Sequence, residues 1–228
     1  PQVRRDGDIY RMTLGAEWEG VGGCALQYSS RDLHTWTYDG VLASRPTSEM
    51  QPYTGRVWEC PQFLQIDGRW VLLVSGMDPD DDFGQVMYAI GDYEGDRFTA
   101  TTWGQFGHSR TVYATTTFTD EEGRACAMSW LRELPVEEGQ TWRGSQSLVH
   151  VLNVIDDRLV VSQHPDLDPV MEHEDPAWSL TIDIDDAHSG SFCVDVDRWS
   201  LVLDWDAHLL HVSVDEARSE EHTSELQS

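Results

Sequence analysis

The chain has 228 residues and a formal net charge of −26 at pH 7, because 41 Asp and Glu outnumber 15 positive residues, all of them arginine. A chain this acidic lacks the basic stripe that neutralises phosphates, which argues against nucleic-acid binding, and it lacks a polybasic helix for a membrane surface. Apolar residues make up 39% of the sequence, too many for a disordered chain. The longest apolar runs, such as residues 71–74, are far too short to cross a bilayer.

In the first part of the chain, short strand-forming segments alternate with turn signals, and helical periodicity is nearly absent. The segments expected as strands are residues 8–14, 70–74, 85–90, 113–118, 124–131 and 158–161. A glycine follows an acidic residue at Gly7, Gly40, Gly68, Gly95 and Gly123, at intervals of 27 to 33 residues. Two such intervals hold about four strands, the content of one propeller blade. Residues 1–164 therefore predict an all-β domain with about three propeller blades. An ordinary β-sandwich, with closer turns, is the alternative.

The composition changes after residue 164. Prolines and acidic residues predict a linker over residues 165–178, and alternating patterns predict strands at 180–184, 191–196, 199–203 and 209–214. We interpret residues 179–217 as the first strands of a truncated second domain, also all-β. Residues 218–228, RSEEHTSELQS, resemble the translation of a sequencing adapter and are left out of the fold. The start at Pro1 suggests that sequence precedes it.

The cysteines and histidines do not form a metal-binding pattern. Cys24, Cys60, Cys126 and Cys193 are too far apart in sequence for a zinc knuckle or a redox pair, and the histidines lack ligand spacing. We therefore expect no cofactor and no metal. The compartment is left open, with the cytoplasm preferred to secretion.

One carboxylate stands out among the many. Glu59 lies between Trp58 and Cys60 and is followed by Pro61 and a strand-like run. Such neighbours are expected to desolvate a carboxyl group and raise its pKa, and a carboxyl group that stays protonated can act as a general acid. The simpler alternative is a half-exposed acid at the start of a strand.

The segment Trp58–Pro61 resembles the Glu-Cys-Pro signature of glycoside hydrolase family 32, the β-fructofuranosidases, which include invertase, levanase and sucrose-6-phosphate hydrolase. Further segments agree with that family in the same order along the chain. They are Gly7–Met12, Tyr28–Trp36, Tyr113-Ala114, Gly123-Arg124, Ser129–Arg132 and Arg158-Leu159. Three residues alone would be weak support, whereas the ordered set is strong.

The resemblance implies a five-bladed β-propeller followed by a C-terminal β-sandwich. It also implies retaining hydrolysis of terminal β-D-fructofuranosides by double displacement, with Glu59 as general acid/base. Cys60 would tune the hydrogen bonding near Glu59, while Trp58, Tyr113 and Trp130 would line the sugar pocket. The expected partner is a small-molecule or oligosaccharide substrate such as sucrose or a fructan.

The chain also departs from the family pattern. The family's aspartate nucleophile lies in an Asn-Asp-Pro motif, but the one asparagine here, Asn153, is followed by Val154. We therefore expect this chain alone to be inactive. A fructosyltransferase, another propeller furanosidase and a non-catalytic carbohydrate-binding propeller remain alternatives. The sequence does not separate sucrose, sucrose phosphate, levan and inulin as substrates.

Overall fold

The computed structural model describes residues 1–79, 81–107, 110–132, 139, 141, 144–167, 191–196, 199–204 and 209–214, with the backbone alone for 81–83 and from 191 onward. The chain divides into two compact units, Pro1–His173 and Glu174–Ser228. The described residues of both units form antiparallel strands and one short 3-10 turn, which confirms the all-β prediction. No helix among them is long and apolar enough to cross a membrane.

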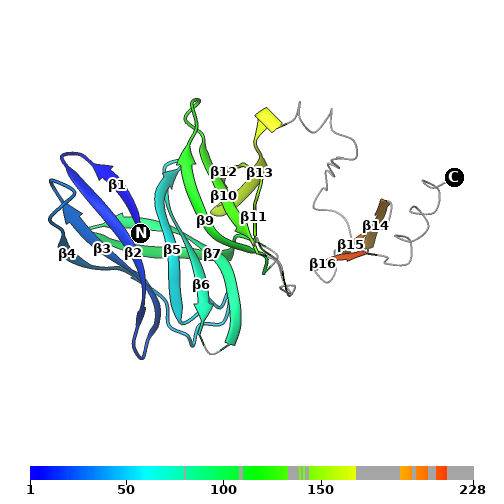
Figure 1. Ribbon diagram of the computed structural model, residues 1–228, viewed down its shortest axis with the longest axis horizontal. Coiled ribbons are helices and arrows are strands. Elements are labelled where there is room, and N and C mark those ends of the chain that lie inside the picture. Colours follow the sequence, from blue (N-terminus) through cyan, green and yellow to red (C-terminus); the bar gives the residue numbers. More distant parts are fainter. Residues whose placement is uncertain are drawn as a thin grey trace. The chain divides into compact units, whose positions relative to one another are not determined.

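Two four-stranded sheets make up the first two thirds of unit 1 (Figure 1). The first sheet has the order β1-β2-β3-β4, formed by Gln2–Asp6, Ile9–Trp18, Gly22–Ser30 and Thr37–Ser44. The second has the order β5-β6-β7-β8, formed by Val57–Ile66, Arg69–Asp78, Asp81–Glu94 and Arg97–Gln105. In each sheet, neighbours in sequence pair with each other, so both are simple meanders.

The third sheet has five strands and a less regular order. Its strands are β9 (Val112–Thr119), β10 (Ala125–Leu131), β11 (Ser145–Gln146), β12 (His150–Ile155) and β13 (Arg158–Gln163). Strand β10 pairs with β9 on one side and with both β11 and β12 on the other. The described residues of unit 1 therefore form three sheets, the number of blades that the turn spacing predicts.

Four of the five predicted turn glycines lie in hairpins. Gly7, Gly68, Gly95 and Gly123 have positive φ angles and connect β1–β2, β5–β6, β7–β8 and β9–β10. A positive φ favours glycine because it has no Cβ. Gly40 differs from the prediction: it lies inside β4, beside an irregularity in the β3–β4 register, and makes no turn. The β12–β13 turn was missed because Asp156 and Asp157, rather than a glycine, adopt positive φ there.

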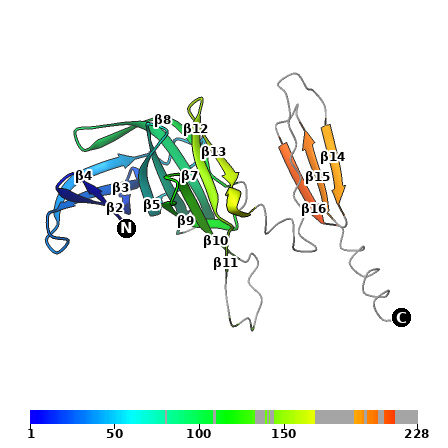
Figure 2. The ribbon, with the colours of Figure 1, turned by 90° about the horizontal axis from the view of Figure 1, so that it is seen from above.

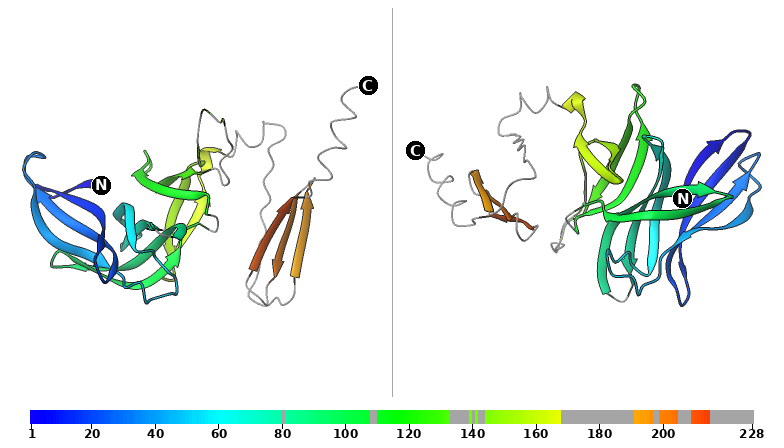
Figure 3. Two further views of the ribbon diagram at one scale, coloured as in Figure 1. Left: turned by 60° about the horizontal axis from the view of Figure 1, so that its bottom comes forward. Right: turned by 180° about the vertical axis from the view of Figure 1, so that it is seen from behind.

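The second sheet lies between the other two, as Figures 2 and 3 show. Side chains of β6 alternate between two hydrophobic clusters. Leu72 and Val74 pack in a cluster shared with the first sheet, while Val71 and Leu73 pack in one shared with the third. This two-sided burial explains why residues 71–74 are continuously apolar rather than alternating.

Glutamine side chains connect the first strands of successive sheets. Gln2 of β1 accepts a hydrogen bond from the backbone N–H of Phe63 in β5, at 2.6 Å. Gln62 of β5 accepts hydrogen bonds from the backbone N–H and the hydroxyl of Thr117 in β9, both at 3.0 Å. Because β1, β5 and β9 are edge strands of their sheets, these amides satisfy backbone groups that have no ladder partner on that side.

Unit 2 contains a three-stranded sheet. Its strands are β14 (Ser191–Val196), β15 (Trp199–Asp204) and β16 (Leu209–Val214), in that order. They coincide with three of the four strands expected there. The fourth, at 180–184, and the adapter-like segment 218–228 lie outside the described residues. Within the expected linker, Pro165–Leu167 form a 3-10 turn, and the rest also lies outside them. The assignment of this unit to a β-sandwich stays a prediction.

Candidate functional site

The start of strand β5 places the side chains of Trp58 and Glu59 on opposite sides of the backbone. Trp58 is 1% exposed and packs in the cluster between the first two sheets, where its indole N–H donates to the carbonyl of Thr54 at 3.0 Å. Glu59 is exposed. A Cβ at Gly23 would lie 2.2 Å from the Trp58 ring, so glycine is required for that close approach. Trp58 therefore anchors the strand on which Glu59 is carried.

A bulge keeps both Glu59 and Cys60 on the solvent side. The β5–β6 register shifts between Glu59 and Gln62, and both Glu59 and Cys60 are exposed, which breaks the alternation of a regular strand. Cys60 has a φ angle of 46°, a left-handed conformation that costs a non-glycine residue about 1–2 kcal/mol. Such bulges are frequent beside functional groups because they re-aim a side chain.

Tyr113 of β9 reaches the Glu59 carboxylate. Its hydroxyl donates a hydrogen bond to Oε2 at 2.9 Å, across 54 positions of sequence. The Tyr113 side chain is 6% exposed. Burial, followed by the hydrogen bond to Glu59 and its negative charge, raises the pKa of Tyr113 above its usual value of about 10. The phenol therefore stays protonated, and it stays a donor, throughout the neutral pH range.

The backbone on the Tyr113 side is also strained. Ala114 has a φ angle of 48°, and its N–H donates to the Ser75 hydroxyl of β6 at 3.1 Å. Two non-glycine residues with left-handed backbone, Cys60 and Ala114, thus follow directly after the two hydrogen-bonded residues. Strain of this kind persists only where surrounding structure fixes it, and it clusters at functional sites.

Arg132 covers the Tyr113 ring. Its guanidinium carbon lies 4.3 Å from the ring centroid, and Nη2 donates to the carbonyl of Gly84 at 2.9 Å. A Cβ at Gly84 would lie 2.9 Å from Nη2, so a side chain there would displace the arginine. The phenol is held between an arginine on its face and a carboxylate at its hydroxyl.

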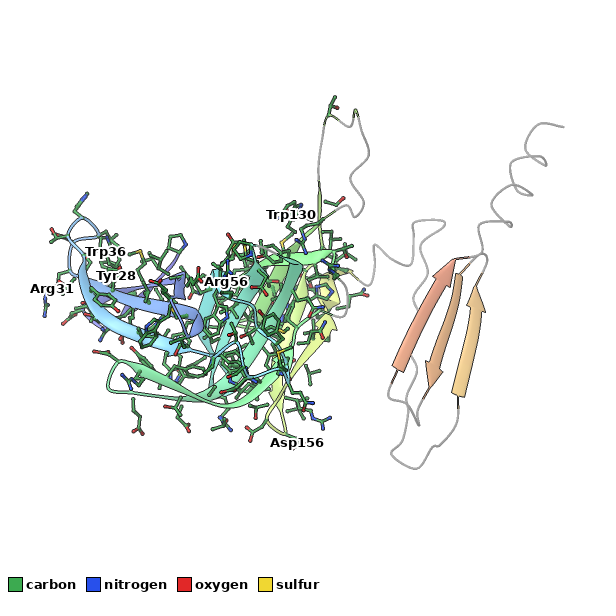
Figure 4. The ribbon with its side chains drawn as sticks, turned by 90° about the horizontal axis from the view of Figure 1, so that it is seen from below. Tyr28, Arg31, Trp36, Arg56, Trp130 and Asp156 are labelled. Carbon is green, nitrogen blue, oxygen red and sulfur yellow. The ribbon has the colours of Figure 1, made fainter. Side chains whose placement is uncertain are left out.

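Trp130 of β10 lies directly opposite Tyr113 in the β9–β10 register and is 42% exposed. Figure 4 shows it at one end of the third sheet, with Asp156 of the β12–β13 turn at the other end. An exposed indole can support a sugar ring, since it offers a flat apolar face with a polar edge.

The structure thus brings together Glu59, Cys60 and Tyr113 of the predicted residues, pairs Trp130 with Tyr113 in the β9–β10 register, and separates Trp58 from them. The ring of Trp58 is in the core, where it supports the site without facing it. The expectation that Trp58 and Cys60 desolvate Glu59 is also corrected, because the bulge exposes the carboxylate. Partial desolvation of the sulfur, followed by the negative charge of Glu59, raises the pKa of the Cys60 thiol. This thiol therefore stays protonated at neutral pH.

Arg132 and Ser75 were missed by the sequence reasoning. Arg132 is the last residue of Ser129–Arg132, a segment that resembles the family. This resemblance is the sequence feature that could have pointed to Arg132 as a site residue. Ser75 carries no signal, because its role depends on β6 lying beside β9, a contact between two sheets.

A separate cluster at the far end of the third sheet contains potential metal ligands. Asp120, Cys126 and His164 place their ligand atoms within 4.8 Å of one another in the described part of the chain. However, Arg124 forms an ion pair with Oδ2 of Asp120. The N–H of Asp166 donates to Nδ1 of His164, so the proton on Nε2 is donated to Asp120 at 3.1 Å. Because the guanidinium already supplies a fixed positive charge, we assign no metal to this cluster.

The three sheets pack side by side as the blades of a propeller do, and the first strand of the middle sheet carries an exposed carboxylate. These two features define a class of protein: a propeller-related β protein with a potential acid/base group. The family follows from comparison with known proteins. The family model for the N-terminal domain of glycosyl hydrolases family 32 matches residues 1–165, and the chain belongs to this family.

Curated relatives include two bacterial proteins named sucrose-6-phosphate hydrolase. The Vibrio alginolyticus protein is 28% identical over 190 residues, which cover 76% of this chain and 38% of the relative. The Bacillus subtilis protein is 24% identical over 188 residues, which cover 76% of this chain and 39% of the relative. The chain thus spans about two fifths of the length of these relatives.

Solved structures share the fold. The β-fructofuranosidase of Bombyx mori matches with a TM-score of 0.62 and 23% identity over 88% of this chain and 41% of that one. The sucrose-6-phosphate hydrolase of Lactobacillus gasseri matches with a TM-score of 0.61 and 25% identity, over 74% of this chain and 37% of that one. A variant of the Bombyx mori enzyme was solved in complex with sucrose. The three sheets of unit 1 therefore correspond to part of the family's propeller.

Proposed function

We propose that this chain is the acid/base segment of a retaining β-fructofuranosidase, in which Glu59 protonates the leaving oxygen of a terminal β-D-fructofuranoside. The observation that carries the proposal is the 2.9 Å hydrogen bond from Tyr113 to an exposed Glu59 on a bulged, strained segment. Family membership supports the reaction class, and the bulge supports the assignment of Glu59, because it turns this acid toward solvent where a substrate can reach it.

The site chemistry follows from the two protonation states of one carboxyl group. In the first step, protonated Glu59 gives its proton to the departing sugar oxygen while a nucleophile attacks the anomeric carbon. In the second step, the Glu59 carboxylate removes a proton from water, which releases fructose from the covalent intermediate. The Tyr113 hydroxyl donates to Glu59 and holds its orientation, since its raised pKa keeps its proton in place through both steps.

The other proposed roles depend on where each side chain lies. Trp130 offers an exposed face for the sugar, and Cys60 adjusts the hydrogen bonding beside Glu59. Tyr113 lines the pocket through its hydroxyl. Trp58 contributes by fixing strand β5 from the core, which replaces the direct sugar contact first expected for it.

The nucleophile of the double displacement is not supplied by an Asn-Asp-Pro motif in this sequence. The chain spans about two fifths of its relatives, and we propose that the nucleophile comes from sequence that those relatives have in addition. Sucrose and its 6-phosphate are the substrates we favour, because the curated relatives described above are named for the phosphorylated sugar. Fructans remain the second choice.

The test compares Glu59→Gln with the unchanged residue in the full-length protein that contains this chain. Glutamine keeps the size of the side chain but cannot transfer the proton, so kcat/KM for sucrose and sucrose 6-phosphate should fall by roughly 10²–10⁴. A fructoside with an acidic phenol as leaving group should lose much less in the first step, because its departure needs no proton. Unchanged sucrose hydrolysis in the variant would remove Glu59 from the role.

Two controls complete this test. The 228-residue chain alone should show no turnover, since covalent catalysis without its nucleophile loses several orders of magnitude. Measuring products with a sugar acceptor present separates a hydrolase from a fructosyltransferase. If the full-length protein binds sugar but turns over no fructoside, the non-catalytic alternative replaces the proposal.

A further inference from the structure

A groove lies between the edges of the first two sheets, and its lining includes no residue of β5, the strand that carries Glu59. Its walls are residues 41–44 of β4 and 97–100 of β8, and its volume is about 550 Å³. Strand β8 is the fourth strand of a sheet whose first strand, β5, carries Glu59. Three strand spacings separate them, roughly 14 Å. The groove is therefore distinct from the site proposed above.

One end of the groove offers an aromatic surface. Trp18, the last residue of β2, lines the groove and is 46% exposed. Trp103 of β8 also lines it, but the guanidinium of Arg45 lies over that ring, 4.9 Å from the centroid. Trp18 is thus the accessible apolar platform, and Trp103 is part of the wall.

Polar groups around this platform are fixed in place. Arg45 is 7% exposed; its Nη1 pairs with Glu49 at 2.9 Å, and its Nη2 donates to the carbonyl of Gln51 at 2.9 Å. Its Nε is buried and has no hydrogen-bond partner. A buried donor without an acceptor is costly, so a ligand oxygen placed at this Nε would be stabilising.

The strand edges add backbone donors and acceptors. Strands β4 and β8 are both edge strands of their sheets, so alternate N–H and C=O groups have no ladder partner on the outer side. Arg97 is an exposed residue at the start of β8 and contributes further donors. Concave sites with a few convergent polar groups beside an aromatic face are typical of small-molecule binding.

The charge balance favours a neutral ligand. Glu49 neutralises Arg45, which leaves Arg97 as the remaining positive charge at the groove, on a chain with a net charge of −26. An anion in this groove would have Arg97 to balance its charge, whereas a neutral ligand needs no counter-charge there. A saccharide combines many hydroxyl groups with an apolar ring face, and it carries no charge.

We propose that this groove is a second saccharide-binding site, which holds a sugar unit on Trp18 with its hydroxyl groups on Arg45, Glu49, Arg97 and the strand edges. Such a site holds a long substrate near the catalytic centre and raises its effective concentration. The choice of a fructo-oligosaccharide as probe rests on the function proposed above, whereas the site itself rests on the groove.

The test is a titration of the 228-residue chain with inulin-type fructo-oligosaccharides, monitored by the indole N–H resonances in ¹H–¹⁵N NMR spectra. We expect the Trp18 signal to shift with a Kd on the order of 1 mM. Trp18→Ala should weaken binding about tenfold or more, and Trp18→Phe, which keeps an aromatic face, should retain most of it. Tyr38→Ala, which removes an exposed aromatic of β4 outside the groove, is the matched control and should bind as before.

Separate arms distinguish this site from the proposed active centre and from an anion site. Glu59→Gln should leave the Trp18 titration unchanged, so a failure of the proposed function does not affect this result. The inference is overturned if Trp18→Ala binds equally well, or if no shift appears on the order of 10 mM oligosaccharide, tenfold above the expected Kd. It is also overturned if fructose 6-phosphate or inorganic phosphate, rather than the neutral sugar, shifts the Trp18 signal.

Discussion

The two ends of the β9–β10 strand pair differ in how their polar groups are satisfied. At one end, Tyr113 stands opposite Trp130 in register and donates to the exposed carboxylate of Glu59. At the other end, the turn between the strands carries Asp120, which accepts hydrogen bonds from the side chains of Arg124 and His164.

The energetic character of the two ends differs accordingly. The Glu59 end keeps a left-handed backbone at Ala114, which costs stability, together with an exposed indole and an exposed carboxylate. The Asp120 end directs three donors, including the backbone N–H of Arg124, at one carboxylate. The same strand pair thus has fully paired polar groups at one end, whereas the other end keeps the strain and exposed groups that are typical of functional sites.

The largest effect should come from removing the support of the Glu59 end. Trp58→Ala deletes a fully buried indole that packs on Trp103 and Gly23, and we expect a loss of about 3–5 kcal/mol in the free energy of unfolding. Urea unfolding followed by circular dichroism measures this loss. The control is Trp130→Ala, which removes a 42% exposed ring and should cost about 1 kcal/mol or less. Equal losses in both variants would contradict the assignment of Trp58 to the core.

The second-largest effect should come from removing the Tyr113 hydroxyl, which tests whether its hydrogen bond supports Glu59. Tyr113→Phe removes a hydrogen bond to a charged group, worth about 1.5–3 kcal/mol, so kcat/KM in the full-length protein should fall roughly 10- to 100-fold. Stability should change little, because the Glu59 carboxylate is exposed to water. Thr116→Val removes a hydroxyl from an exposed position of the same strand and should leave activity unchanged. If Tyr113→Phe and Thr116→Val have the same kcat/KM, the hydrogen bond from Tyr113 to Glu59 does not contribute to catalysis.

The Asp120 end can be tested by pH. Partial desolvation acts to raise the pKa of Asp120, but hydrogen bonds from Arg124 and His164 outweigh it and lower the pKa to about 2. The unfolded value is about 3.9, so the stabilisation by the carboxylate is present above pH 4 and is lost as the pH falls toward 2. Asp120→Asn lacks this contribution. The stability gap between wild type and variant, measured by urea unfolding, should therefore shrink from pH 5 to pH 2.5.

A neighbouring acid provides the control for this pH effect. Glu121 is exposed and adjacent in sequence, and Glu121→Gln should change the gap little over the same pH range. A gap for Asp120→Asn that stays constant between the two pH values would show that the ionised carboxylate does not stabilise the fold.

The smallest effect concerns the strained backbone at Ala114. Ala114→Gly relieves a left-handed conformation worth about 1–2 kcal/mol, and the added flexibility of glycine offsets about 0.5–1 kcal/mol of it. The free energy of unfolding should stay within about 1 kcal/mol of the original value or rise slightly. Ala127→Gly, in a fully buried position of β10, should be destabilised by about 1–2 kcal/mol. A similar loss in both variants would show that Ala114 is unstrained.

Much of the fold followed from local patterns. Strand-forming residues and turn glycines predicted segments of β2, β6, β7, β9, β10 and β13, because each hairpin depends on residues close in sequence. The acid-glycine rule fails at two places: Gly40 follows an acid but lies inside β4, and the β12–β13 turn uses Asp156 and Asp157 without a glycine. The buried run of β6 was recognised as apolar, but its position between two other sheets was not encoded in its own residues.

The candidate site, like the fold, depends partly on local sequence patterns and partly on tertiary packing. The sequence by itself determined an all-β chain of hairpins and singled out Glu59, since these depend on strand periodicity, turn residues and a short motif. Only the tertiary structure decided that Tyr113 reaches that acid with Arg132 over its ring, that Trp58 faces the core, and that Trp18 and Arg45 share a groove. The physical reason is that contacts between sheets are set by how whole faces pack, and residues on different sheets carry no local signal of one another.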